Sequence, residues 1–137
     1  MKICLSLALA AILLATVSLS AARPANLANT SWALQVNGAT EPLTITSQGG
    51  PGAPGAANCR IINGEVRNVA DVRGWYCPST GRIHFVHSNL DSGRAVRVFT
   101  GNVSDEQPGQ PLRMAGTMTV VNSAFGDLGE YNFSATN

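Results

Sequence analysis

The sequence is almost without lysine: Lys2 is the only one, and it precedes residues 23–137, the part that we expect to form the mature protein. That part carries eight arginines against four aspartates and four glutamates, so its net charge is zero. Proteins that bind nucleic acid or acidic membrane surfaces concentrate basic residues in one region. The balanced, scattered charges therefore argue against both kinds of partner.

Signatures of catalysis and metal binding are also missing. The many serines do not occur in a G-x-S-x-G or comparable motif. His84 and His87 have an odd separation, so on one strand they face opposite sides and cannot chelate a metal together. Asp105 and Glu106 are more simply solvated loop residues than an acid–base pair. We expect no enzyme activity, no metal site and no cofactor.

Only the N-terminus contains a long apolar run. It covers residues 3–17, after the positive start Met1-Lys2, and small residues follow it up to Ala22. This arrangement is typical of a secretory signal peptide, and the run is short of the roughly 20 apolar residues that a membrane span needs. We expect residues 1–22 to be a signal peptide and residues 23–137 to be one secreted or periplasmic domain without a membrane span.

The sequence contains three cysteines, of which Cys4 lies in the expected signal peptide. Two cysteines in an exported chain most simply form one disulfide, which predicts a bond between Cys59 and Cys77. Closing a loop of this size contributes roughly 3 kcal/mol to stability in the chain-entropy model.

The segment between these cysteines reads as a β-hairpin folded back about Asn68. The pairs that this register predicts are Cys59 with Cys77, Ile61 with Trp75 and Asn63 with Arg73. Trp75 then shares a face with Cys77, and we expect it in the core together with Trp32. Tyr76 points the other way and is either a mouth residue or a surface residue.

Short runs of alternating apolar residues, separated by turn signals, predict eight strands, and no ten-residue window after the N-terminal run has an apolar stripe at helical spacing. The expected strands cover approximately residues 30–37, 43–45, 60–66, 70–77, 82–88, 95–103, 112–121 and 129–135. Asn37-Gly38 is a hairpin turn, whereas Gly49–Ala57 is so rich in Gly, Pro and Ala that we expect a loop. Consecutive hairpins without a long crossover favour an antiparallel up-and-down β-barrel, because closure removes exposed edges.

Several short sequence motifs lie on these expected strands and turns at the spacing typical of β-barrels. They are Thr30-Ser31-Trp32, Asn37-Gly38, Asn63-Gly64-Glu65-Val66, Phe99-Thr100-Gly101 and Ala115-Gly116-Thr117. On these motifs the chain resembles the lipocalin-like and avidin-like secreted β-barrels over nearly all of residues 23–137. Position 30 is Thr where lipocalins usually place Gly, and the last three strands contain none of the tryptophans with which avidins surround biotin.

Alternate loops of an up-and-down barrel share one end, and we name the end formed by the first, third, fifth and seventh loops the odd-loop end. These loops are expected at residues 37–41, 67–69, 89–94 and 122–127. In the families that the chain resembles, this end is the ligand mouth. We therefore expect non-catalytic binding of a small, partly apolar ligand there. The residues expected at the rim are Asn37, Asn68, Asn89, Arg94 and Phe125, and those expected inside are Trp32, Phe85 and Phe99.

Two other functions stay open. The chain could be a protein-binding or inhibitor module with an interior filled by side chains, or a structural domain without a ligand. A cavity favours the ligand-binding function, and a packed interior favours the protein-binding one. Three glycosylation sequons begin at Asn29, Asn102 and Asn132 and matter only in a eukaryotic source.

The seventh expected strand is apolar on both faces. Met114, Met118 and Val120 occupy one face, and Ala115 and Val121 leave the other partly apolar. A strand of this kind is often covered on its outer side. Avidin-like barrels pair through late strands, so the resemblance implies a homodimer through strands six and seven.

Overall fold

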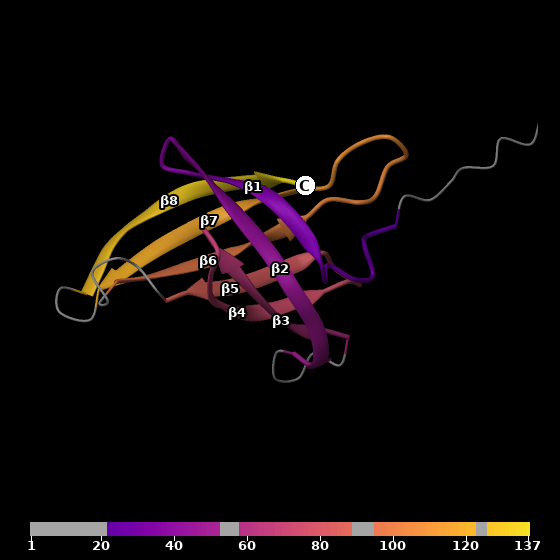
Figure 1. Ribbon diagram of the computed structural model, residues 1–137, viewed down its shortest axis with the longest axis horizontal. Helices are drawn as coiled ribbons and strands as arrows, with labels where there is room; N and C mark the ends of the chain where they lie inside the picture. The colour runs from indigo at the N-terminus through magenta and orange to yellow at the C-terminus, as the bar shows by residue number, and fades with distance from the viewer. Residues whose placement is uncertain (1–21, 53–57, 89–94, 123–125) are drawn as a thin grey trace, which may run out of the picture.

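Eight antiparallel strands form a closed barrel in the computed structural model, which describes residues 22–52, 58–88, 95–122 and 126–137 (Figure 1). Each strand pairs with its neighbours in sequence, and the first strand pairs with the last. The strands are β1 (Thr30–Val36), β2 (Ala39–Pro51), β3 (Arg60–Val66), β4 (Val69–Cys77), β5 (Arg82–His87), β6 (Ala95–Val103), β7 (Arg113–Asn122) and β8 (Gly126–Thr136). The predicted fold class is confirmed. The predicted signal peptide lies outside the described residues, except for Ala22.

The first turn is tighter than expected. It consists of Asn37 and Gly38 alone, with φ values of 47° and 79°, and Val36 pairs directly with Ala39. Two central residues with positive φ form the turn that matches the twist of a two-stranded hairpin. Residue Glu41 is therefore part of β2 and does not belong to the loop in which it was expected.

The predicted loop at Gly49–Ala57 is wrong in its first part. Gly49 pairs with Ile61 and Pro51 pairs with Arg60, so β2 runs on to Pro51, while residues 53–57 lie outside the described residues. The pairing shifts register between Gly49 and Pro51, and Gly50 has a φ of 67°. A bulge of this kind accommodates Gly and Pro in a strand that composition alone would exclude.

The central hairpin, β3 and β4, has the predicted register. Ile61 pairs with Trp75 and Asn63 pairs with Arg73, and the disulfide between Cys59 and Cys77 is present. Near the turn the register shifts, so that Val66 pairs with Val69. The turn is therefore Arg67-Asn68, with φ values of 54° and 63°, rather than a bend centred on Asn68 alone.

The side chains that point inward form a hydrophobic core among the described residues. Their core consists of three phenylalanines surrounded by aliphatic residues and methionines from all eight strands. The rings of Phe85 and Phe99 stack at 4.5 Å with an interplanar angle of 11°, and Phe133 packs edge-on against Phe99 at 5.2 Å. Offset or edge-on aromatic pairs of this kind are favourable beyond the area that they bury. The middle of the barrel interior is thus a packed aromatic core.

Two glycines make room for this core. Gly101 on β6 pairs with Gly116 on β7, and a Cβ added to Gly101 would lie 2.3 Å from the carbonyl oxygen of Ala115 and 3.1 Å from Cζ of Phe133. No side chain fits at that distance from a backbone oxygen. The Phe133 ring therefore occupies space that any larger residue at position 101 would take.

We expect Gly101→Ala to lower the free energy of unfolding by about 1–3 kcal/mol, because the neighbouring strand must shift to admit the methyl group. Urea denaturation monitored by tryptophan fluorescence measures the change. Gly49→Ala is the matched control, since a Cβ there meets no atom within 4 Å. Its effect should stay below about 1 kcal/mol. Equal effects of the two substitutions would contradict the close packing at Gly101.

The chain that precedes β1 closes one end of the barrel, which we name the even-loop end because the β2–β3, β4–β5 and β6–β7 connections lie there. Leu27 is completely buried, and the Tyr76 hydroxyl donates a hydrogen bond of 2.8 Å to the Pro24 carbonyl oxygen. Burial raises the pKa of Tyr76 to about 12, so the hydroxyl keeps its proton as a donor. Figure 1 shows the N-terminal segment at the same end of the barrel as the β6–β7 connection and the C-terminus.

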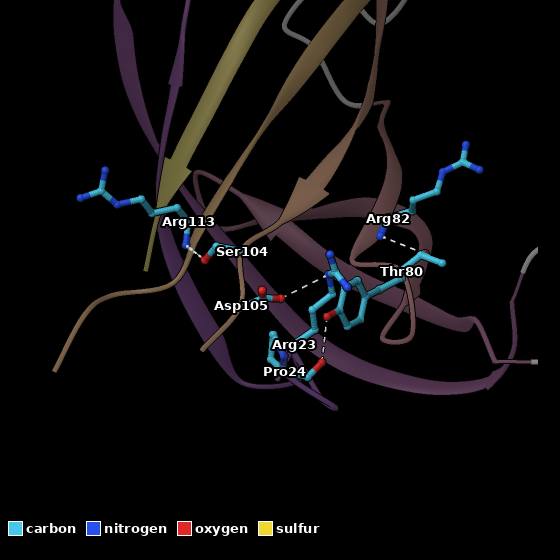
Figure 2. A network of polar contacts seen from close by, with 8 residues as sticks. Arg23, Pro24, Thr80, Arg82, Ser104, Asp105 and Arg113 are labelled. Carbon is cyan, nitrogen blue, oxygen red and sulfur yellow. Dashed lines mark hydrogen bonds and ion pairs between the residues drawn. The ribbon is translucent and has the colours of Figure 1, made fainter. Parts of the chain in front are cut away.

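Polar contacts fasten this segment from outside. Arg23 Nε lies 3.5 Å from Asp105 Oδ1, and the Glu106 amide donates to the Ala22 carbonyl oxygen at 2.8 Å. Figure 2 shows Arg23 directed toward Asp105, with Ser104 and Arg113 bonded beside them. The even-loop end is therefore sealed by a plug that is apolar inside and polar outside. Within the described ranges, no helix is long and apolar enough to cross a membrane.

Candidate functional site

Three charged or polar side chains are buried inside the barrel toward the odd-loop end. They are Glu41 on β2, His87 on β5 and Arg97 on β6, which are only 5%, 3% and 8% exposed. Each occupies an inward position in line with apolar core residues of its own strand. A buried polar group is costly unless it is paired, so these residues mark a specialised part of the interior.

An ion pair crosses the lumen. Arg97 Nη1 lies 2.8 Å from Glu41 Oε2, although β2 and β6 do not neighbour each other in the barrel. Glu41 Oε2 has no hydrogen-bond partner, so this contact is an ion pair. Arg67, from the turn between β3 and β4, bonds the other oxygen of Glu41, and its side chain is 57% exposed. One carboxylate therefore faces two guanidinium groups.

The two arginines keep Glu41 ionised. Burial alone would raise the pKa of this carboxyl, but the nearby guanidinium groups of Arg97 and Arg67 outweigh burial and lower the pKa below its ordinary value of 4.5. Opposite charges within bonding distance favour the charged form of a carboxyl. The Glu41 carboxylate is therefore the one negative charge of the cluster at neutral pH.

His87 is neutral at neutral pH. Burial lowers its pKa below 6.5, and the positive charge of Arg97 lowers it further, against smaller opposing effects of Glu41 and Asp71. His87 Nδ1 lies 2.9 Å from Arg97 Nη2. His87 Nε2 and Arg97 Nε have no hydrogen-bond partner among the described residues. Leaving such a buried group unpaired costs about 1–3 kcal/mol, so each calls for an explanation.

The predicted interior residues are all inside. Trp32, Phe85 and Phe99 are no more than 2% exposed. Phe85 and Phe99 stack on each other, and the Arg97 guanidinium lies 5.8 Å from the centre of the Phe99 ring. Trp32 belongs to the same core, but its indole N–H already donates to Thr30 Oγ1 at 2.8 Å. The structure therefore brings Phe99 to the polar cluster and gives Trp32 a structural bond of its own.

The predicted rim is described only in part. Asn37 and Asn68 occupy the β1–β2 and β3–β4 turns at the odd-loop end, and both are exposed. Asn89, Arg94 and Phe125 lie outside the described residues. Asn37 borders an open groove of about 460 Å³ between the β1–β2 hairpin tip and β8. The other residues that line the groove are Gln35, Val36, Gly38, Ala39, Thr40, Asn132, Phe133 and Ser134.

Sequence reasoning missed the polar cluster, although a signal for it exists. Glu41 is an even number of positions from the apolar Leu43 and Ile45 on β2, so it shares their face of the strand. Arg97 shares a face with Phe99 and Val103 on β6 for the same reason. Inward and outward residues alternate along a strand, so a charged residue on the apolar parity is expected inside. His87 follows the same rule after Phe85, and its predicted opposition to His84 is confirmed by the burial of the one and the partial exposure of the other.

The predicted faces of Trp75 and Tyr76 are reversed. Tyr76 is completely buried, whereas Trp75 lies on the outer face, stacked on His84 at 5.6 Å with Arg82 5.9 Å from its ring centre. Tyr76 shares the inward face of β4 with Val72, and its hydroxyl finds an acceptor in the Pro24 carbonyl oxygen. Trp75 is therefore part of an outer aromatic surface rather than of the core.

The described parts of the chain contain no group of three or more His, Cys, Asp or Glu side chains arranged to hold a metal ion. Comparison with protein-family models, with curated proteins and with solved structures finds no match to this chain.

The chain has two histidines, and acid should destabilise the fold through both. Burial lowers the pKa of His84 and His87 below 6.5, so just below that pH the unfolded chain binds more protons than the folded one. Stability then rises with pH. We expect the urea midpoint to fall as the pH drops below 6.5 and, through Glu41, to fall again below 4.5.

The double variant His84→Gln/His87→Gln should lose the first of these two declines and keep the second. Urea titrations at pH 7.5, 6.0, 5.0 and 4.0 separate the two windows. A wild-type midpoint that is constant from pH 7.5 to 5.0 would contradict the lowered histidine pKa values.

Proposed function

We propose that this protein is an exported, non-catalytic barrel that binds a small, partly apolar ligand at the odd-loop end. The observation that carries the proposal is the contrast between the two ends. The even-loop end is sealed by Leu27 and Tyr76, whereas the interior toward the odd-loop end contains Glu41, His87 and Arg97. A few convergent polar groups beside an apolar surface are characteristic of small-molecule sites.

The surroundings of the cluster supply the apolar part of such a site. The Phe99 ring lies against Arg97, and a separate groove beside Asn37, lined by residues of β1, β2 and β8 and not by the polar cluster, lies at the same end. Because the middle of the barrel is filled by phenylalanine rings, the ligand would sit above this core. The resemblance to lipocalin-like and avidin-like barrels, whose mouths lie at this end, supports the same location.

Export is supported by two independent features. The disulfide between Cys59 and Cys77 is compatible with an extracellular or periplasmic location, where disulfides persist. The charged start, apolar run and small residues at positions 1–22 are typical of a signal peptide.

Native mass spectrometry of the protein purified from its own host tests the ligand. We expect a discrete additional mass that disappears on denaturation, together with a chain that begins at Arg23. The same measurement on Arg97→Lys should show less of the adduct, whereas Arg82→Lys on the outer face should leave it unchanged. A bare oxidised chain under gentle conditions would contradict the ligand-binding proposal.

The packed interior favours a second candidate, a protein-binding module that uses the outer face of β3, β4 and β5. Trp75 is flanked there by Ile61, which is 43% exposed, and by His84. Large exposed apolar and aromatic side chains are characteristic of protein interfaces. If this candidate is right, Trp75→Ala should abolish a defined complex in the host's extracellular fraction, and Arg97→Lys should not.

We also propose that two copies pair through β6 and β7. Ala115 and Val121 are exposed on β7, and Val96 and Val98 on β6 are only partly buried. Sedimentation should show a dimer at micromolar concentration, and Val121→Arg should convert it to a monomer. A wild-type monomer at that concentration would exclude the pairing.

A further inference from the structure

The bonding of His87 fixes which of its nitrogens carries the proton. Arg97 Nη2 lies 2.9 Å from His87 Nδ1, and a guanidinium group can only donate. Nδ1 must therefore accept, and in the neutral imidazole the proton is on Nε2. His87 Nε2–H is a hydrogen-bond donor that finds no acceptor among the described residues.

The Arg97 side chain contains a second buried donor that finds no acceptor among the described residues. Its Nη1 faces Glu41 and its Nη2 donates to His87, but its Nε–H has no partner in the described part of the chain. His87 and Arg97 are directly paired residues on β5 and β6, and both are more than nine-tenths buried. Two unsatisfied donors thus project from neighbouring inward positions, and both require an acceptor.

The charges around these donors favour an anionic acceptor. Arg67 and Arg97 carry two positive charges, Glu41 carries one negative charge, and His87 is neutral. Asp71, the other acid that acts on His87, is only partly buried. The buried charges of Arg97 and Glu41 balance each other, and Arg67, whose side chain is 57% exposed, gives the whole cluster a surplus of one positive charge, which a single carboxylate would balance. Hydrogen bonds between charged partners are also stronger than those between neutral ones.

The packing limits the size of the remainder of the ligand. Phe99 lies against Arg97 and stacks on Phe85, and Phe133 fills the space beside them. These rings lie below the arginine, so the remainder of the ligand would lie toward the mouth, and the side chains over the two donors, which are closed to solvent, would have to move to admit it. Resting on the proposed function above, we propose that the ligand is a small organic carboxylate whose oxygens accept hydrogen bonds from His87 Nε2 and Arg97 Nε.

Matched small probes test the ligand class on the full mature chain. Benzoate and hexanoate are compared with benzyl alcohol and hexanol, which have similar apolar parts but no charge, by two-dimensional NMR titration at pH 7.5. We expect each carboxylate to bind about tenfold to hundredfold more tightly than its alcohol, the range for a charge-assisted hydrogen bond. Shifts should centre on residues of β5 and β6.

Variants separate the roles of the two donors. His87→Leu should weaken benzoate binding about tenfold or more, because the Nε2 donor is lost. His87→Gln keeps an acceptor for Arg97 and a donor for the ligand and should restore most of the affinity. His84→Leu, on the outer face of the same strand, is the matched control and should bind like the wild type. If His87→Leu does not fold, Arg97→Lys tests the Nε donor in its place.

The outcomes distinguish this inference from the function on which it rests. If alcohols bind as tightly as carboxylates, the site binds ligands but the carboxylate class is wrong. If His87→Leu and Arg97→Lys bind benzoate like the wild type, the anion lies elsewhere and the inference is overturned. If no probe binds and native mass spectrometry shows a bare chain, the ligand-binding function itself fails.

Discussion

Replacing Glu41 with glutamine should lower the free energy of unfolding by about 3–5 kcal/mol, because it leaves the buried Arg97 charge without a counter-charge. Glutamine has nearly the same shape, so the change tests charge rather than packing. Arg97 is 8% exposed and Glu41 is 5% exposed, which places both in the range where water cannot replace the lost partner. Urea denaturation at pH 7.5 gives the difference.

Two further variants identify the source of this effect. Arg67→Gln removes the exposed partner of Glu41 and should cost no more than about 1 kcal/mol, the usual value of a surface ion pair. The double variant Glu41→Gln/Arg97→Met removes both buried charges and should recover most of the stability that Glu41→Gln alone loses. A single Glu41→Gln variant as stable as the wild type would show that water or another charge reaches Arg97.

Loss of the disulfide between Cys59 and Cys77 should lower the free energy of unfolding by roughly 3 kcal/mol, since the bond closes a loop with a sequence separation of 18. The double variant Cys59→Ala/Cys77→Ala and the reduced wild type should lose similar amounts. In the chain-entropy model the effect acts on the unfolded chain, which becomes more extended without the bond. The dependence of stability on urea concentration should therefore become steeper.

Dithiothreitol provides the control for this experiment. It should lower the stability of the wild type and leave the double alanine variant unchanged. A reduced wild type within about 1 kcal/mol of the oxidised protein would mean that the β3–β4 pairing alone holds this hairpin, since removing a native disulfide usually costs at least 2 kcal/mol.

The hairpin shows how far the sequence determines the fold and where it stops. The pairing of Ile61 with Trp75 follows from two cysteines and a central turn, and the structure confirms it. The inward face was predicted wrongly, because the adjacent large residues Trp75 and Tyr76 put an apolar side chain on both faces of the strand. A local signal exists, since Val72 shares the buried face of Tyr76 and the exposed Arg73 shares the face of Trp75. The hydrogen bond from Tyr76 to Pro24, which lie 52 positions apart, could not be predicted from a local pattern.

Part of the candidate site could likewise be predicted from the sequence, and part could not. Strand order predicts which loops share the odd-loop end, whereas the choice of that end for a ligand comes from the family resemblance; Phe85 and Phe99, which were predicted to be inside, are buried there. Glu41 and Arg97 were not found, since an ion pair across the lumen joins strands that are not neighbours in the sequence or in the sheet. A charged residue on an inward parity was the only local indication of it.

The seam between β1 and β8 determines when this barrel can become complete. It has four residue pairs, against ten between β7 and β8. Beside it, the side-chain amide of Asn137 donates a hydrogen bond to the carbonyl oxygen of Ser31, 106 positions away. Bringing such distant segments together costs loop entropy before any contact rewards it, so barrels of this kind fold slowly, over about milliseconds to seconds. A chain emerging from a ribosome or a translocation pore cannot close until its last strand is free. Until then β1 and β7 are edge strands with unpaired backbone groups, to which strands of other chains could bind. The time that β8 takes to pair with both of them determines how long they stay exposed.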